Sequence, residues 1–170
     1  DGVEKPGLQS AGQIAWFSYN DLDEARCKSF AGGPSIGLEM QVTLWAYKGT
    51  PNLDDVIFKR YRLIYKGTSA ARPGSSIDSI FITQWTDPDV GIASNDLGGC
   101  DSTLSLGYVF NSTEPDPVYR NLGGANPALG YTLLQGQLVS GSQNDRGIFD
   151  FEIQQSKKNL AMTSFLLNAT

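Results

Sequence analysis

Apolar residues recur at every second position in several segments of this chain, and this two-residue period is the feature that most constrains its fold. Residues 37–47 read GLEMQVTLWAY, and residues 102–111 read STLSLGYVFN. Successive side chains of a β-strand point to opposite faces of a sheet, so this alternation predicts strands with one face toward a core. The 3.6-residue period of helices is almost absent, which argues against an α/β fold.

The same reasoning predicts further strands, separated by segments rich in Gly, Pro, Ser and Asn. They are expected at residues 13–19, 56–67, 76–85, 130–139, 147–153 and 161–170. One helical turn is expected at residues 23–28 and a long surface loop at residues 112–129. We therefore predict an all-β fold, an antiparallel, jelly-roll-like β-sandwich with long loops.

A chain of 170 residues is long enough for one well-buried core. We expect a single sandwich domain over residues 14–170, preceded by an extended arm or linker over residues 1–13. The chain starts without Met and its last predicted strand reaches the final residue, so we expect it to belong to a longer polypeptide. Other domains of that polypeptide or neighbouring copies of the chain are the expected partners.

Composition excludes several classes of protein. The 13 Lys and Arg residues are scattered and the formal net charge is −5, which argues against binding to a nucleic-acid backbone. No apolar run approaches the roughly 20 residues of a membrane helix, so no membrane insertion is expected. Charged residues make up only 18% of the chain, a value typical of the Ser-, Thr- and Gly-rich surfaces of extracellular proteins.

The segment from Trp85 to Asp101, WTDPDVGIASNDLGGCD, departs from strand patterning and concentrates acidic residues. It is expected to be irregular, because it is rich in Gly, Pro and Asn. Ca²⁺ prefers six to eight oxygen ligands, and carboxylates crowded into one loop repel each other unless a cation neutralises them. The predicted calcium ligands are Asp87, Asp89, Asn95, Asp96 and Asp101. The alternative is a solvated loop whose Asp residues cap turns through Asx hydrogen bonds.

Catalysis is not expected. The sequence contains no histidine, which excludes Ser-His-Asp and Cys-His mechanisms and removes the commonest zinc ligand. A glycosidase-type pair of carboxylates is the remaining option, and no spacing singles one out. The two cysteines, Cys27 and Cys100, form either one disulfide that closes a long loop or two separate thiols.

Aromatic residues on the predicted strands permit a different function. If Trp45 belonged to an exposed aromatic row, it would offer a stacking platform for sugar rings, as in carbohydrate-binding modules. The alternative is that Trp45 packs in the sandwich core.

Six blocks of the sequence, taken together and in order, resemble a β-rich module of large secreted or surface proteins of Bacteroidetes-type bacteria, which often carry a type IX secretion sorting domain. The blocks are WFSYNDLDEAR, IGLEMQVTLWAY, IFKRYRLIYKG, QWTDPDVG, GCDSTLSLGYVFN and KNLAMTSF. This chain departs from the family pattern at Asn95, where an Asp is usual, and near Ile92, where an acidic residue is usual. These departures leave fewer charges for a cation.

The resemblance implies secretion and a non-catalytic role. Together with the predicted calcium ligands, it leads us to expect a calcium-stabilised structural or adhesive module of a bacterial surface protein or extracellular assembly. It also implies an O-glycan at Ser102, within an Asp-Ser-Thr tripeptide, and Asn111 fits the N-glycan pattern Asn-Ser-Thr. Two other functions remain open. One is a carbohydrate-binding module, and the other is a filament or sheath subunit that assembles by strand addition.

Overall fold

The computed structural model describes residues 10–68, 75–113 and 115–167. Its contacts divide the chain into two compact units, unit 1 (Asp1–Ile82) and unit 2 (Thr83–Thr170). The predicted single domain over residues 14–170 stays a prediction, and residues 1–9 of the predicted arm lie outside the described residues.

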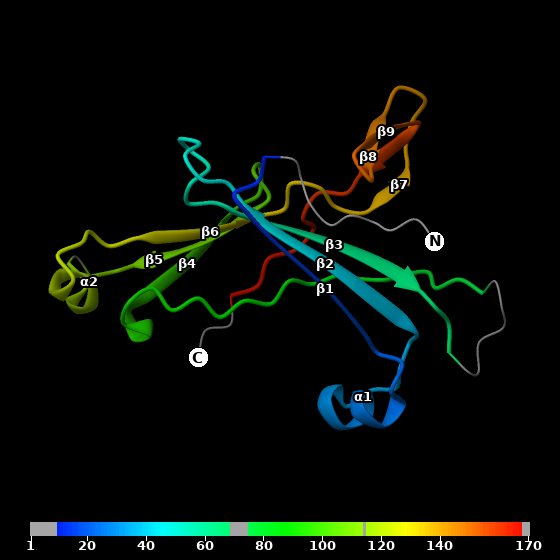
Figure 1. The fold of residues 1–170 in the computed structure, drawn as a ribbon, viewed down its shortest axis with the longest axis horizontal. Coiled ribbons are helices and arrows are strands. Elements are labelled where there is room, and N and C mark those ends of the chain that lie inside the picture. The colour runs from blue at the N-terminus through cyan, green and yellow to red at the C-terminus, as the bar shows by residue number, and fades with distance from the viewer. Residues whose placement is uncertain (1–9, 69–74, 114, 168–170) are drawn as a thin grey trace. The chain divides into compact units, whose positions relative to one another are not determined.

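Unit 1 is built on a three-stranded antiparallel sheet with the order β1-β2-β3. The strands are β1 (Gln13–Asn20), β2 (Leu38–Ala46) and β3 (Ile57–Tyr65), and Figure 1 shows them lying side by side. The register runs without a skip from Gln13 opposite Ala46 to Asn20 opposite Glu39. All three strands fall where the alternating pattern predicted them, because the two-residue period matches the pleat of a strand.

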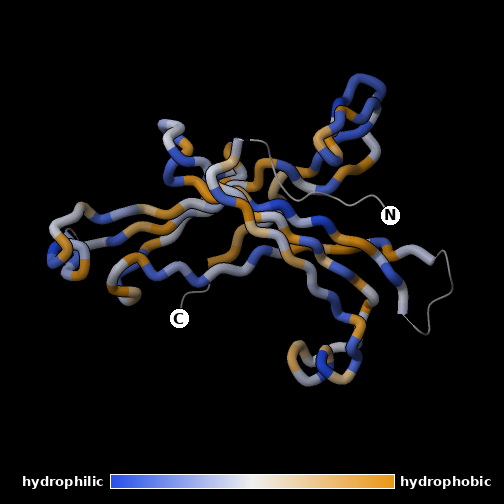
Figure 2. Tube along the Cα trace, viewed as in Figure 1, coloured by the Kyte–Doolittle hydropathy of each residue, from blue (hydrophilic) through white to orange (hydrophobic). Residues whose placement is uncertain are grey.

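The register gives the two faces of this sheet different characters. Phe17, Val42 and Tyr61 stand in one row across the strands, and the next row holds Tyr19, Met40 and Leu63. We call this side the apolar face of unit 1; Val42 is only 2% exposed there. The opposite side carries Thr43, Gln41, Arg60 and Arg62 as well as aromatic residues, and Figure 2 shows hydrophobic and hydrophilic positions interchanging along the strands.

Asp21 joins the end of β1 to the start of β2. Its carboxylate accepts hydrogen bonds from the backbone N–H groups of Ile36 at 2.7 Å, Gly37 at 3.2 Å and Leu38 at 2.6 Å. In the sequence, β1 and β2 are separated by helix α1 (Glu24–Ala31), which confirms and extends the predicted helical turn. The Asp23 side chain caps the helix by accepting from the Arg26 N–H, the interaction for which Asp is favoured at this position.

Unit 2 contains a second three-stranded antiparallel sheet with the order β4-β5-β6. Its strands are β4 (Asp96–Asp101), β5 (Leu106–Asn111) and β6 (Ala128–Thr132). A short 3-10 helix, η1 (Ala93–Asn95), precedes β4, and helix α2 (Pro117–Asn121) follows β5. The remaining strands form two small antiparallel pairs, β7 (Leu138–Ser140) with β10 (Lys157–Asn159), and β8 (Arg146–Phe149) with β9 (Glu152–Gln155).

Several sequence predictions about the elements are wrong. The segment 85–101 is not irregular throughout, because its last part is β4. Glycine is tolerated in this strand since the Tyr108 ring occupies the space beside Gly99, where a Cβ atom would meet the ring at 2.5 Å. Residues 76–85 form no strand. No described strand pairs with this segment, and Phe81 is 91% exposed.

The segment 147–153 was predicted as one strand and is instead a hairpin. Asp150 and Phe151 form its turn with φ angles of 54° and 66°. A turn with two left-handed residues usually contains glycine, so this pair gave no turn signal. The predicted strand 130–139 is divided between β6 and β7, and the predicted strand 161–170 is absent from its described part, residues 161–167.

The prediction of an all-β, antiparallel fold is confirmed, because antiparallel strands dominate both units and the helices are short. The packing of sheets face to face as a sandwich stays a prediction. The buried apolar side chains among the described residues are Val42 in unit 1 and Val90 and Val109 in unit 2. No described helix is both long enough and apolar enough to cross a bilayer.

Candidate functional site

Among the described residues of unit 2, Asp116 is the most completely buried polar side chain, with 0% of it exposed. Its carboxylate accepts hydrogen bonds from the Val118 N–H at 2.8 Å and from the Ile92 N–H at 3.2 Å. It also accepts from the Asn95 side-chain amide at 3.2 Å. Asp116 therefore caps α2 and at the same time holds the segment that leads into β4.

Burial raises the pKa of the Asp116 carboxyl, but hydrogen bonds from the backbone of Ile92 and Val118 and from the Asn95 amide outweigh it. The pKa accordingly lies below its usual value of 3.8. The carboxyl is thus ionised at neutral pH, and N–H dipoles of Ile92, Val118 and Asn95 stabilise its negative charge.

Asn111, at the end of β5, stands among the oxygen atoms of the same region. Its side-chain nitrogen Nδ2 donates to Asp96 Oδ1 at 2.9 Å, to Asn95 Oδ1 at 3.1 Å and to the backbone carbonyl of Val90. Its own Oδ1 is buried and has no hydrogen-bond partner among the described residues. We call the group formed by Val90, Asn95, Asp96, Asn111 and Asp116 the polar cluster.

The polar cluster leaves no room for a side chain at Gly91. This residue has a φ of 85°, and a Cβ atom there would lie 2.5 Å from Asp116 Oδ1. Only glycine adopts this backbone conformation readily and also permits the carboxylate to approach so closely. The Val90 N–H donates to Asp96 Oδ2 at 2.9 Å and the Ile92 N–H to Asp116 Oδ2, so carboxylates of the cluster hold the residues on both sides of Gly91.

The structure brings together only two of the five predicted calcium ligands, Asn95 and Asp96. Asp101 lies at the other end of β4, about 17 Å away along an extended strand. There its Oδ1 accepts from the N–H and hydroxyl of Thr103 and from the Leu104 N–H, which lowers the pKa of its carboxyl. Asp87 and Asp89 are exposed on the segment before the cluster.

Sequence reasoning missed Asp116 and Asn126 and assigned Asn111 a different role. Asn126 Oδ1 accepts from the Asp116 N–H at 2.8 Å, which fixes the loop after β5. These residues lie beyond the acidic segment in a stretch without periodicity. One signal was available, the Asp-Pro pair at residues 116 and 117, because Asp before Pro marks a helix start.

The other predicted sites lie apart from the polar cluster. Cys27 and Cys100 are free thiols that belong to different units. The Trp45 ring stacks on Phe58 with centroids 5.2 Å apart, so one side of the indole is covered. Ser102 is exposed in the turn between β4 and β5, whereas the Asn111 nitrogen that a glycan would occupy is engaged in the cluster.

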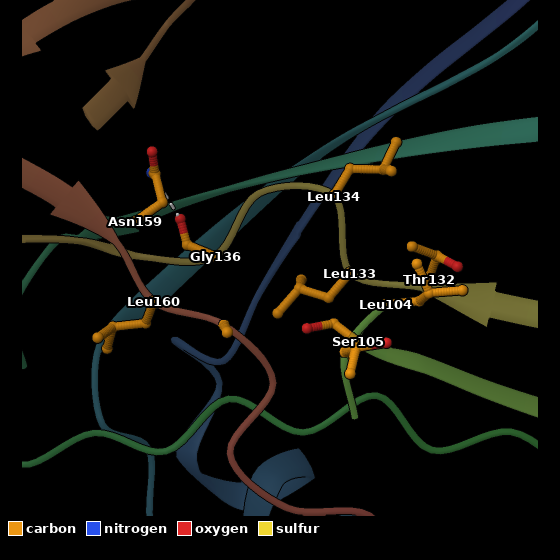
Figure 3. A pocket seen from close by; sticks show the side chains of 10 residues that line it. Leu104, Ser105, Thr132, Leu133, Leu134, Gly136, Asn159 and Leu160 are labelled. Atoms are coloured by element: carbon orange, nitrogen blue, oxygen red, sulfur yellow. Dashed lines mark hydrogen bonds between the residues drawn. The ribbon is translucent and has the colours of Figure 1, made fainter. Parts of the chain in front are cut away.

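Unit 2 also has an open hollow of about 530 Å³, shown in Figure 3. Its lining includes Leu133, Leu134, Leu160, Ser105 and Asn159, and no titratable side chain is among the described residues that line it. The Asn159 amide donates to the carbonyls of Gly136 and Ile148, each at 3.0 Å. Because the protein itself uses these polar groups, the hollow offers few hydrogen-bonding atoms to a ligand.

Comparison of the chain with protein-family models, with curated proteins and with solved structures finds no match. The resemblance to a secreted bacterial module therefore stays a prediction. Among the described residues, no three carboxylate, thiol or imidazole side chains form a metal-binding group.

Proposed function

We propose that this chain is a non-catalytic, extracellular structural module in which a Ca²⁺ ion stabilises the polar cluster of unit 2. The observation that carries the proposal is the surplus of oxygen atoms around Asn111. Three oxygens face Nδ2, which has two hydrogen atoms, and the buried Oδ1 of the same amide has no described partner. A cation that prefers oxygen ligands would neutralise this surplus of oxygen atoms.

The donor atoms of the cluster suit calcium. Asp96 supplies a carboxylate, Val90 a backbone carbonyl and Asn95 an amide oxygen, the three kinds of oxygen that Ca²⁺ binds in proteins. A half-turn of the Asn111 amide exchanges its oxygen and nitrogen and adds a fourth ligand. Exposed Asp89 or water would complete the shell. Asp116 already accepts three hydrogen bonds and remains a structural anchor for the ligands.

The composition of the cluster supports an extracellular setting. With few carboxylates and several neutral oxygens, the cluster matches the weak calcium sites of extracellular modules, which have dissociation constants of about 10⁻⁴–10⁻³ M. Such a site fills only where free calcium is millimolar. The role that we assign to the ion is structural, because it would tie the segment before β4 to the ends of β4 and β5.

Thermal unfolding with and without calcium tests the proposal. At a calcium concentration of about 100 times Kd, binding adds roughly 2.7 kcal/mol to stability, which corresponds to a rise of about 5–10 °C in Tm. EGTA should reverse the rise. Asp96→Asn should remove most of it, whereas the matched control Asp87→Asn, in the exposed part of the same segment, should retain it. A Tm that responds neither to calcium nor to EGTA would contradict the proposal.

A further inference from the structure

Strand β1 forms one edge of the unit 1 sheet and lacks the features that protect sheet edges. All eight of its residues are exposed, and no described strand pairs with its free side. Its sequence, QIAWFSYN, contains no charged residue, no Pro and no Gly. Natural proteins usually protect an edge with charges, prolines, bulges or a short strand, because an unprotected edge pairs readily with another strand.

The outer strand on the other side of the sheet differs in charge. Strand β3 carries Lys59, Arg60 and Arg62 within its nine residues. Two copies of β3 placed edge to edge would bring these cations together, which like-charge repulsion disfavours. The two edges of one sheet are therefore unequal, and only β1 can pair with a copy of itself without that repulsion.

The register shows which backbone groups of β1 are available for pairing. The Asp21 N–H donates to the Leu38 carbonyl, so Asp21 and Leu38 form a hydrogen-bonded pair. Such pairs alternate along an antiparallel ladder, so the odd-numbered residues of β1 bond to β2. The N–H and C=O groups of Ile14, Trp16, Ser18 and Asn20 accordingly point to the free side.

We infer that β1 is a self-association edge, and that a second copy of this chain pairs its own β1 antiparallel to it. The pairing produces one continuous sheet with three strands from each copy. Outward-facing groups must meet outward-facing groups, so even-numbered residues stand opposite even-numbered residues. With the two-fold axis at Phe17, Trp16 pairs with Ser18 and Ile14 with Asn20, and all four outward residues find partners.

This geometry also determines which faces of the two sheets adjoin. Residues directly opposite each other in antiparallel strands point to the same side of the sheet. The apolar face of one copy therefore continues the apolar face of the other, and the Phe17 side chains of both copies meet at the junction. Phe17 is 45% exposed and Tyr19 is 50% exposed, so aromatic surface is available for this contact. A symmetric pair closes on itself, which favours a dimer over a filament.

The test uses the position where a proline affects only the free edge. Ser18→Pro removes an outward N–H and leaves the hydrogen bonds between β1 and β2 in place, and edge strands tolerate such a proline. Lys59→Pro is the matched control. The Lys66 N–H bonds to Gly37, so even-numbered residues of β3 face β2 and the Lys59 N–H points outward. Sedimentation equilibrium of the full chain should show the mass rising from 18.4 kDa toward twice that value as concentration increases.

Ser18→Pro should stay at 18.4 kDa at every concentration, and Lys59→Pro should dimerise like the parent chain. Hydrogen exchange gives a second measurement that needs no variant. The amides of Trp16 and Ser18 should exchange about tenfold more slowly at high than at low protein concentration, and the Lys59 amide should not change. A parent chain that is monomeric up to about 1 mM, or a dimer that Ser18→Pro leaves intact, overturns the inference.

Discussion

Asp21 in unit 1 and Asp116 in unit 2 have the same structural role, but the polar groups around them differ. Each carboxylate holds segments that are distant in sequence by accepting backbone N–H groups, and each lies beside a glycine in the left-handed region, Gly37 at 82° and Gly91 at 85°. Around Asp21, three consecutive N–H groups match the carboxylate. Asp116 also has three donors, but beside it the Asn111 amide faces a surplus of oxygen atoms.

We call the segments held by each carboxylate the Asp21 junction and the Asp116 junction. The difference indicates at which of them the protein supplies enough hydrogen-bond donors for all the oxygen atoms. The Asp21 junction has donors for both carboxylate oxygens and needs nothing further. The polar cluster has enough donors for Asp116 but too few for the oxygens that face Asn111. Calcium should therefore stabilise the cluster and leave the Asp21 junction unaffected.

Asp21→Ala should have the largest effect, because it leaves three backbone N–H groups at the start of β2 without their charged acceptor. The loss of charge-assisted hydrogen bonds predicts a decrease of about 3 kcal/mol in the free energy of unfolding. Urea denaturation of the full chain measures this decrease. Hydrogen exchange at Leu38 shows whether it arises at the junction, and calcium should not restore the lost stability.

Asp23→Ala is the matched control for this substitution. Asp23 lies two residues away and caps α1 by a single side-chain bond, so its loss should cost only about 1 kcal/mol. Its ion pair with Arg26 is largely exposed and adds little. Equal effects of the two substitutions would show that Asp21 acts as an ordinary cap, and the comparison with Asp116 would then fail.

Gly91→Ala should weaken the polar cluster through close contact. Alanine at residue 91 is strained by its positive φ and also meets the Asp116 carboxylate. Gly123→Ala has the same strain at a φ of 71°, but nothing lies within 4 Å of its Cβ position. We expect Gly91→Ala to destabilise the chain by about 2 kcal/mol more than Gly123→Ala in urea denaturation. Equal effects would mean that Asp116 moves away from residue 91 at no cost.

The long strands of the fold could be predicted from the sequence because their signal is local. Strand β2 shows an alternation that spans its whole length, and β3 and β5 repeat it. The elements that were predicted wrongly depend on contacts with residues far away in the sequence. β4 depends on pairing with β5 and on the Tyr108 ring beside Gly99, and neither can be read from the segment itself.

The polar cluster was predicted only in part for the same reason. Asn95 and Asp96 were predicted as ligands because the segment is rich in acidic residues. The same argument also predicted Asp101, which lies at the far end of β4 from the cluster. The residues that complete the cluster, Asn111 and Asp116, come from 15 and 24 residues further along the chain than the atoms they contact in Asp96 and Ile92. The antiparallel pairing of β4 with β5 places Asn111 opposite Asp96. The register of this pairing cannot be read from either segment alone.

Acid should have the smallest effect and should act on the Asp116 junction. The lowered pKa of Asp116 means that its stabilising contribution is complete above its usual value of 3.8 and is lost as pH falls through the folded-state pKa. The urea midpoint should therefore decrease as pH falls from about 5 to about 3, and Asp116→Asn should remove part of this slope. The rest should persist, because Asp101 and Asp145 also have lowered pKa values. An NMR titration of the Asp116 carboxyl checks the direction, and a pKa above 3.8 would show that burial outweighs the three hydrogen bonds.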